Sequence, residues 1–97
     1  MTYSVYLLIS KHKGRILSYV GYTKDIKKRL KLHNVSRGAK YTKGKKWIVF
    51  HKEIYNSKSK AMSREYELKN DKQFRKSLKQ KFVSIDNKNS FTKNRLQ

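Results

Sequence analysis

The chain has 97 residues, of which 26 are Lys or Arg and only 6 are Asp or Glu, so its formal net charge is +20. This length predicts a single domain, and the absence of cysteine excludes disulfide bonds, thiolate metal sites and thiol nucleophiles. A compact chain with this much positive charge repels itself, which predicts a polyanionic partner.

The first predicted element is a β-hairpin. Residues 3–9 are rich in aromatic and β-branched side chains, which is typical of a buried strand. The polar stretch 11–15 contains one glycine and predicts the hairpin loop, so residues 16–22 form the returning strand. The same apolar run (residues 5–9) is the longest in the chain and is too short for a membrane span or a secretory signal.

A helix is predicted to follow the hairpin. Thr23 can cap it, and Asp25 falls in its first turn, where negative charge is favourable. Ile26 and Leu30 are four residues apart and form its buried side, and the helix ends near Asn34. Residues 35–46 are polar and basic with two glycines, which predicts a loop.

The remaining elements are a third strand and two helices. The strand covers residues 47–55, and the second helix covers about 58–70, with Ser57 or Ser59 as its cap. Asp71 can cap the third helix, which ends near residue 82. The order is β-β-α-β-α-α, an α+β fold (α/β sandwich) in which helices flank a small three-stranded antiparallel sheet.

We expect residues 1–82 to form the domain and residues 83–97 to be a poorly ordered basic tail, because the tail is polar and has no sustained hydrophobic period. The charge is concentrated at the other end. Residues 1–52 contain 14 Lys and Arg against one acidic residue, so the basic surface belongs mainly to the first half of the chain.

Among the six acidic residues, Glu65 is in an unusual position. Ala61, Glu65 and Leu68 follow the i, i+4, i+7 pattern of a helix face that is directed to the core. A carboxylate there is either paired with one of the many basic residues or placed in a cleft for metal binding or catalysis. Spacing alone leaves both interpretations open.

Two further sets of residues can carry chemistry. Arg29 and His33 share one face of the first predicted helix, where Arg can bind a phosphate and His can exchange a proton near neutral pH. Tyr6 and Tyr19 lie on the two strands of the hairpin, close to opposite one another, and a phenol can orient or activate water. A solvated basic helix face and ordinary strand packing are the simpler explanations.

The predicted loop of residues 35–46 interleaves basic residues with one tyrosine and two glycines. Basic side chains neutralise phosphates and an aromatic ring can stack on a nucleobase, so the loop predicts nucleic-acid binding. A merely solvated loop is the alternative. The nucleic-acid-binding candidates in this loop and the preceding helix are Lys24, Lys28, Arg37, Lys40, Tyr41, Lys43, Lys45 and Lys46.

These segments occur in the order of a known family. Residues 3–80 resemble a GIY-YIG endonuclease domain of the small stand-alone bacterial type, which is similar to the N-terminal nuclease domain of the excision-repair C subunit. The matching stretches, in chain order, are Ser4-Val5-Tyr6, Tyr19-Val20-Gly21, Arg29-Leu30-Lys31-Leu32-His33, Gly38-Ala39-Lys40-Tyr41-Thr42 and Ser63-Arg64-Glu65-Tyr66-Glu67-Leu68-Lys69. The chain departs from the family where Ser-Val replaces Gly-Ile in the first signature, and at Tyr22, where some members have Lys.

The resemblance implies the same antiparallel fold and a set of catalytic residues. Glu65 would be the sole protein ligand of one Mg²⁺ or Mn²⁺ ion, Tyr6 would activate the attacking water, and Tyr19 would position the water or the phosphate. Arg29 would hold the scissile phosphate, and His33 would assist proton transfer or phosphate positioning.

The resulting prediction is a metal-dependent endonuclease that hydrolyses phosphodiester bonds in DNA, including branched or damaged DNA, with a role in repair or recombination. RNA is not excluded as a substrate. The alternatives are a non-catalytic nucleic-acid-binding module on the same fold and a small basic protein associated with ribosomes. We expect a cytoplasmic location (on the nucleoid if the protein is bacterial) and no membrane partner. The sequence does not indicate an oligomeric state.

Overall fold

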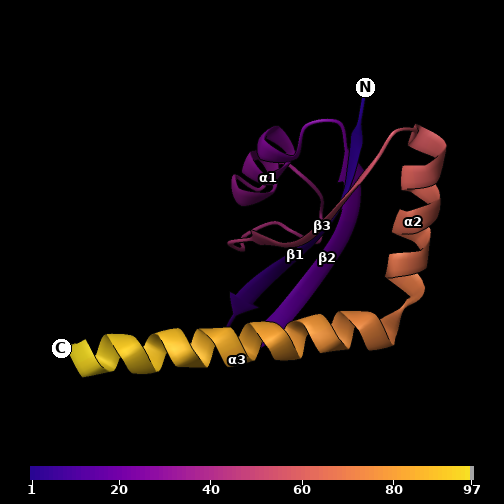
Figure 1. Cartoon of the computed structure of the whole chain (residues 1–97). Helices are drawn as coiled ribbons and strands as arrows, with labels where there is room; N and C mark the ends of the chain where they lie inside the picture. The colour runs from indigo at the N-terminus through magenta and orange to yellow at the C-terminus, as the bar shows by residue number, and fades with distance from the viewer. Residues whose placement is uncertain (97) are drawn as a thin grey trace.

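The computed structural model describes the backbone of residues 1–96 and the side chains of residues 1–88. The elements are β1 (Tyr3–His12), β2 (Arg15–Thr23), α1 (Ile26–Asn34), β3 (Ile48–Tyr55), α2 (Lys58–Asn70) and α3 (Lys72–Leu96) (Figure 1). The three strands form one antiparallel sheet in the order β2-β1-β3. The α+β fold and the order β-β-α-β-α-α are therefore confirmed.

The hairpin of β1 and β2 closes through a tight turn at Lys13 and Gly14. Both residues have positive φ values, 51° and 76°, as a two-residue hairpin turn that matches the twist of the strands requires. In the resulting register Tyr6 pairs with Gly21, and Leu8 pairs with Tyr19. Because side chains alternate along a strand, the rings of Tyr6 and Tyr19 lie on the same face of the sheet, as predicted.

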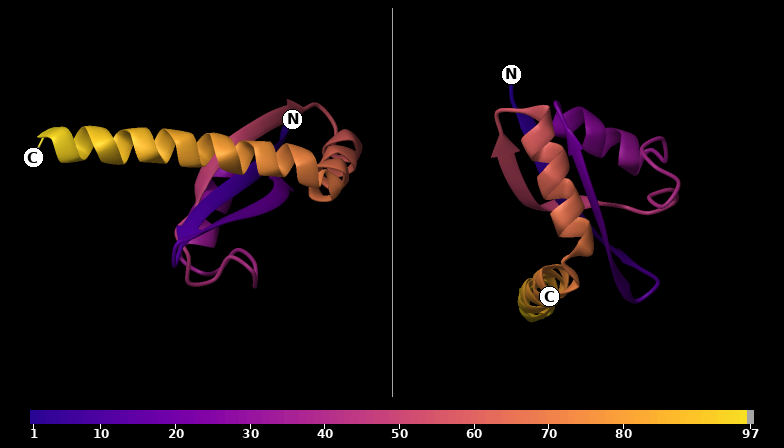
Figure 2. Two further views of the ribbon diagram at one scale, coloured as in Figure 1. Left: turned by 90° about the horizontal axis from the view of Figure 1, so that it is seen from below. Right: turned by 90° about the vertical axis from the view of Figure 1, so that its right-hand side faces the viewer.

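Helices cover both faces of the sheet (Figures 1 and 2). Alternate residues of β1, including Val5 and Leu7, pack with Ala61 and Leu68 of α2 in one core cluster, to which α3 also contributes. The other β1 residues, Tyr6 and Leu8, form a second cluster on the face that α1 covers. The central strand is therefore buried on both faces, and each face is committed to a different packing partner.

The helix caps agree with the sequence except at α1. Ser57 caps α2 by accepting a hydrogen bond from the backbone of Lys60, and Asp71 accepts one from Phe74 at the start of α3. At α1 the cap is Asp25, whose carboxylate accepts from the Lys28 backbone N–H at 3.1 Å. The prediction of Thr23 as the cap is wrong by two residues, because its hydroxyl bonds to the backbone of Asp25 instead.

Helix α3 is longer than predicted. It does not end near residue 82 but continues to Leu96. Residues 83–96 contain no Pro or Gly that would end a helix. The Phe82 ring packs on Phe50 at 5.6 Å, and Asp86 pairs with Lys11 at 2.9 Å, so β1 and β3 both hold the helix. The division into a domain of residues 1–82 and a tail stays a prediction, and Gln97 lies outside the described residues.

No helix of residues 1–96 has the length and apolar composition needed to cross a membrane.

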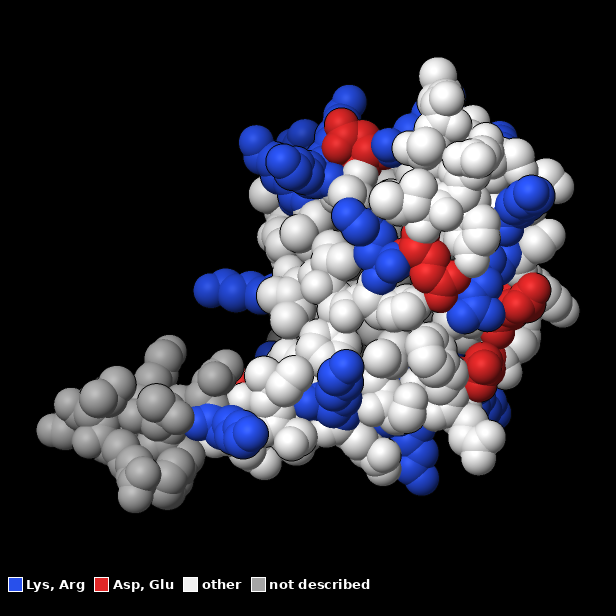
Figure 3. Space-filling view, viewed as in Figure 1, with Lys and Arg blue, Asp and Glu red and all other residues white. Residues whose placement is uncertain are grey.

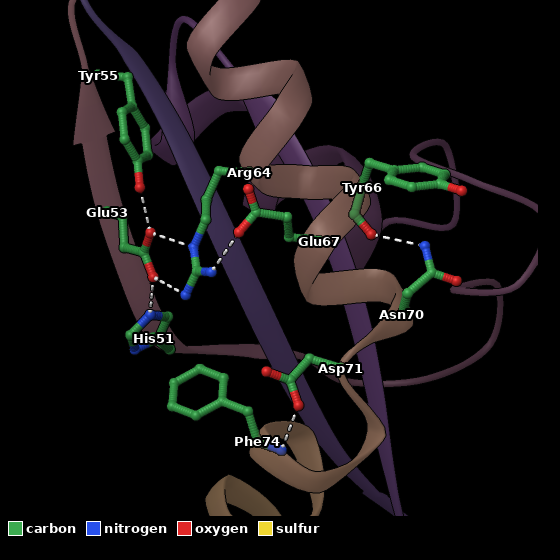
Figure 4. Close-up of polar contacts among 9 residues, drawn as sticks. All are labelled: His51, Glu53, Tyr55, Arg64, Tyr66, Glu67, Asn70, Asp71 and Phe74. Atoms are coloured by element: carbon green, nitrogen blue, oxygen red, sulfur yellow. Dashed lines mark hydrogen bonds and ion pairs between the residues drawn. The ribbon is translucent and has the colours of Figure 1, made fainter.

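A cluster of polar contacts around Glu53 fastens β3 to α2 (Figure 4). The Arg64 guanidinium donates to both carboxylate oxygens, at 2.8 and 3.1 Å. His51 lies 2.6 Å from one of these oxygens, and the Tyr55 hydroxyl donates to the other at 2.5 Å. The hydrogen bonds from Arg64 lower the pKa of Glu53 to about 2, against the effect of partial burial. Glu53 thus acts as a partly buried anchor between β3 and α2 rather than as half of a surface pair with the neighbouring Lys52.

We expect Glu53→Gln to destabilise the fold near neutral pH. A carboxyl group whose pKa is lowered on folding stabilises the folded state fully at pH values above its unfolded-state pKa of 4.5. This stabilisation is lost as the pH falls from 4.5 to the folded-state pKa of about 2. The shift corresponds to at most about 3 kcal/mol. Urea unfolding at a series of pH values measures the difference from wild type, which should shrink between these two limits. Glu67→Gln is the matched control, because that side chain is 64% exposed, and an equal loss in both variants would contradict the anchoring role.

Candidate functional site

A buried chain of hydrogen bonds lies on the face of the sheet that α1 covers. The Tyr6 hydroxyl is 3.1 Å from Nε2 of His33, and Nδ1 of His33 is 2.9 Å from the hydroxyl of Thr42. Tyr6 is 1% exposed, and both His33 and Thr42 are fully buried. The three residues come from β1, from α1 and from the loop of residues 35–47, so the fold brings together groups that are far apart in the sequence.

Two glycines allow this close packing. A Cβ atom at Gly21, opposite Tyr6 on β2, would lie 2.5 Å from the Tyr6 hydroxyl oxygen. A Cβ atom at Gly38 would lie 2.2 Å from Nδ1 of His33. Real Cβ atoms do not approach other atoms this closely, so any larger residue at either position would displace the Tyr6 or His33 ring.

Arg29 lies beside the chain of hydrogen bonds. It precedes His33 by one turn of α1, and its guanidinium donates to the Gly38 carbonyl at 3.3 Å. Burial raises the pKa of the Tyr6 hydroxyl, and the contact with Arg29 opposes that rise. Burial and the charge of Arg29 both lower the pKa of His33. At pH 7 the phenol and the imidazole are therefore both neutral.

Tyr19 extends the site with aromatic surface. Its ring centroid is 5.0 Å from that of His33, and it stacks on the ring of Tyr41 at 6.3 Å with an interplanar angle of 19°. The buried Trp47 touches both tyrosines through edge and tilted contacts. Because Tyr41 is 49% exposed, this cluster leads from the buried His33 to the surface.

Glu65 comes from α2, the helix that packs on the opposite face of the sheet from α1. Ala61 and Leu68 are fully buried, as the spacing predicted, whereas Glu65 stays at the edge of the helix with its side chain 19% exposed. One of its oxygens pairs with Lys69 at 3.0 Å, so the ion-pair interpretation describes part of its environment. Burial is the main cause of the raised pKa of Tyr6, and the negative charge of Glu65 adds a smaller contribution to that rise.

The side chains around Glu65 fit a single hard cation that has few protein ligands. Within the described residues no group of three or more His, Asp or Glu side chains could enclose a metal ion. Glu65 offers one carboxylate oxygen that has no protein partner among the described side chains. One carboxylate suits an ion such as Mg²⁺, which keeps several waters and needs few protein ligands.

Most of the predicted nucleic-acid-binding residues are exposed. Figure 3 shows Lys and Arg side chains gathered over α1. The exposed candidates just before α1, within it and in the loop are Lys24, Lys28, Arg37, Lys40, Tyr41, Lys43 and Lys46. Lys45 differs from the others. Its ammonium group donates to the Tyr41 carbonyl at 2.9 Å and lies 5.3 Å above the Tyr41 ring, so it stabilises the loop itself.

Sequence reasoning missed the residues that hold the loop of residues 35–47 in place. The Asn34 side chain accepts from the Trp47 backbone N–H at 2.6 Å and donates to its carbonyl at 3.0 Å. The Trp47 indole N–H donates to the Thr42 carbonyl at 3.0 Å. The small residues Gly38 and Ala39 before Thr42 were the available signal, because small side chains within a basic loop indicate close packing against a neighbour.

Comparison with known proteins places this architecture in a family. The model of the GIY-YIG catalytic domain matches residues 2–79. A UPF0213 protein of Staphylococcus haemolyticus is 46% identical over 65 residues, which are 66% of this chain and 78% of that protein. A UPF0213 protein of Halobacterium salinarum is 48% identical over 52 residues, which are 53% of this chain and 68% of that protein.

A solved structure is also similar. The solution NMR structure of a UPF0213 protein from Bacillus halodurans shares 36% sequence identity, covers 88% of this chain and 85% of its own chain, and has a TM-score of 0.45. The domain match alone extends over most of the chain and includes every candidate catalytic residue from Tyr6 to Glu65. This chain therefore belongs to the GIY-YIG domain family, a family of nucleases, and is similar to the small stand-alone UPF0213 proteins.

Proposed function

We propose that the protein is a metal-dependent endonuclease that hydrolyses phosphodiester bonds in DNA. The observation that carries this proposal is the buried contact between the Tyr6 hydroxyl and His33 Nε2, with Arg29 beside it. Membership in a nuclease family supports a nucleic acid as the substrate. The surplus of basic residues supports tight binding of a polyanion.

In the proposed reaction Tyr6 is the general base. As its oxygen takes a proton from the attacking water, its own O–H proton passes to Nε2 of His33, the water oxygen bonds to phosphorus, and the bond between phosphorus and the leaving oxygen breaks. Because burial raises the pKa of Tyr6, loss of its proton to solvent is unfavourable. In this relay the proton moves instead to His33 Nε2, which is 3.1 Å away. Tyr19 borders the same space and positions the water or the phosphate.

Arg29 holds the scissile phosphate. Its contact with the Gly38 carbonyl uses only part of the guanidinium, which leaves N–H donors for a phosphate oxygen. Glu65 would hold one Mg²⁺ or Mn²⁺ ion, and the bound ion would polarise the phosphodiester and stabilise the leaving oxygen. The exposed basic residues over α1 and the loop hold the flanking phosphates. Because such contacts carry no sequence information, we further propose that DNA structure, such as a branch or a damaged site in repair or recombination, selects the substrate.

A non-catalytic binding module remains the second candidate, and the ion pair between Glu65 and Lys69 favours it. An ammonium group 3.0 Å from the carboxylate neutralises the charge that would attract a metal ion. In the nuclease, Lys69 must move aside when the metal ion binds. The Lys69 side chain is 51% exposed, so it can move toward solvent.

A cleavage assay tests the proposal. Purified protein is incubated with supercoiled plasmid, a single-stranded oligonucleotide, a branched duplex and RNA, each with Mg²⁺, with Mn²⁺ or with EDTA. We expect scission of DNA that requires the metal ion and stops in EDTA. Equal cutting in EDTA would overturn the metal-dependent mechanism. Salt-sensitive DNA binding without scission of any substrate would support the binding module, and preferential association with ribosomes would support the ribosomal alternative.

A further inference from the structure

The loop of residues 35–47 has an exposed outer side and an inner side that forms hydrogen bonds with α1 and within the loop. Asn34 holds the backbone of Trp47 at the end of the loop through two hydrogen bonds, and the Trp47 indole holds the carbonyl of Thr42 in its middle. Thr42 in turn contacts His33, which is one residue before Asn34. The four residues therefore close a ring of contacts that fixes the position of the Thr42 hydroxyl.

The Thr42 hydroxyl has three polar neighbours. The Ala39 backbone N–H donates to it at 3.2 Å, it donates to the Ala39 carbonyl at 3.0 Å, and Nδ1 of His33 lies 2.9 Å away. A threonine hydroxyl carries a single hydrogen. When that hydrogen is directed at the Ala39 carbonyl, the hydroxyl oxygen accepts hydrogen bonds from the Ala39 N–H and from His33.

We propose that Thr42 is a positioning residue that holds His33 in the tautomer with hydrogen on Nδ1. Nδ1–H then donates to the Thr42 hydroxyl, and the lone pair of Nε2 faces the Tyr6 hydroxyl. Its catalytic consequence rests on the proposed nuclease function. The loop thus has two roles: its exposed basic residues face the nucleic acid, and its buried threonine sets the hydrogen position on the imidazole.

The orientation of the ring is fixed separately from its tautomer. The Gly38 backbone lies directly against His33, so close that a Cβ atom there would be 2.2 Å from Nδ1. The Tyr19 ring covers the imidazole from another side, with centroids 5.0 Å apart. These contacts leave Nε2 directed at Tyr6, and Thr42 then decides whether that nitrogen carries a hydrogen.

The tautomer matters because of the proton balance in the proposed reaction. When the Tyr6 O–H bond breaks, its proton forms a new bond to Nε2, and the imidazole becomes an imidazolium that still donates from Nδ1 to Thr42. No other proton has to leave. In the opposite tautomer Nε2 already carries hydrogen and cannot accept the Tyr6 proton.

NMR of the protein labelled with ¹⁵N tests this proposal without relying on activity. The two ring nitrogens of His33, assigned by their loss in His33→Gln, report which one carries hydrogen. We expect the Nδ1–H tautomer in the wild type and in Thr42→Ser, which keeps the hydroxyl. Thr42→Val keeps the shape but removes the acceptor, so the tautomer should become mixed or reversed, and DNA cleavage should fall about tenfold to a hundredfold.

Ser36→Gly is the matched control. It removes another hydroxyl of the same loop, which accepts from the Gly44 N–H at 3.0 Å. The backbone N–H that donates to the His33 carbonyl at 3.2 Å is kept, and glycine readily adopts the φ value of 63° at this position. We expect it to leave the tautomer unchanged. A wild-type His33 with hydrogen on Nε2 overturns the proposal even if Thr42→Val fails to fold. An unchanged tautomer in folded Thr42→Val also overturns it.

The two proposals fail in different ways. If the wild type shows the Nδ1–H tautomer and Thr42→Val loses it, but no DNA is cut with any metal ion, the nuclease proposal fails and the role of Thr42 in holding His33 stands. If the wild type cuts DNA but its tautomer does not depend on Thr42, the nuclease proposal stands and the positioning role fails.

Discussion

Replacement of Glu65 by Gln should reduce metal-dependent DNA cleavage by about a thousandfold or more, because loss of a sole metal ligand removes several kcal/mol of transition-state stabilisation. Gln keeps the size of the side chain but carries no charge. It therefore offers no carboxylate to a metal ion and forms no ion pair with Lys69. Initial rates of plasmid nicking at saturating Mg²⁺ measure the effect. DNA binding in EDTA should not weaken, since the variant removes a negative charge from a surface that binds phosphates.

Glu67→Gln is the control for this prediction. Glu67 lies on the same helix and is 64% exposed, and its carboxylate pairs with Arg64 rather than facing the candidate site. Cleavage by this variant should match the wild type. If Glu65→Gln cuts DNA as fast as Glu67→Gln, Glu65 is not the metal ligand.

Tyr6→Phe should lower the turnover number by about a hundredfold to ten-thousandfold, which is the usual contribution of a general base. The substitution removes only the hydroxyl that lies 3.1 Å from His33, so the ring still fills the space between β1 and α1. It also leaves Nε2 of His33 without its buried partner, which costs about 1–3 kcal/mol of stability. Single-turnover cleavage rates measure the effect on chemistry, and circular dichroism verifies that the variant is folded.

Tyr22→Phe is the matched control, because Tyr22 lies on the neighbouring strand and packs against the core cluster on the opposite face. It should cleave DNA at the wild-type rate. A Tyr6→Phe variant that is folded and as active as Tyr22→Phe would remove Tyr6 from the mechanism and leave Arg29 and Glu65 as the groups to examine.

Much of the fold could be predicted because local signals and the global arrangement agree. The apolar strand, the glycine in the hairpin turn and the caps at Ser57 and Asp71 each have a short-range physical cause that the sequence displays. The cap of α1 was misplaced because Thr23 and Asp25 are both good caps, and only the tertiary path of the chain decides between them. The length of α3 was underestimated because contacts with β1 and β3 hold polar residues in a helix that their own period does not indicate.

The candidate site could be predicted less completely. Helical spacing placed Arg29 and His33 on one face, and strand alternation placed Tyr6 and Tyr19 together. The role of Thr42 could not be deduced, because its contact with His33 depends on how a loop folds back over the helix that precedes it. The anchoring of Glu53 by Arg64 was missed for a related reason, since the pair joins a strand to a helix across 11 sequence positions.

The alternation of side chains along β1 has an evolutionary consequence. Val5 and Leu7 stabilise the core beneath α2, while Tyr6, directly between them, faces His33 on the other side of the sheet. An insertion or deletion of one residue in this strand would exchange the two faces and abolish stability and chemistry in the same event. We therefore expect a one-residue insertion or deletion to be least tolerated in β1, which carries core residues on one face and Tyr6 on the other.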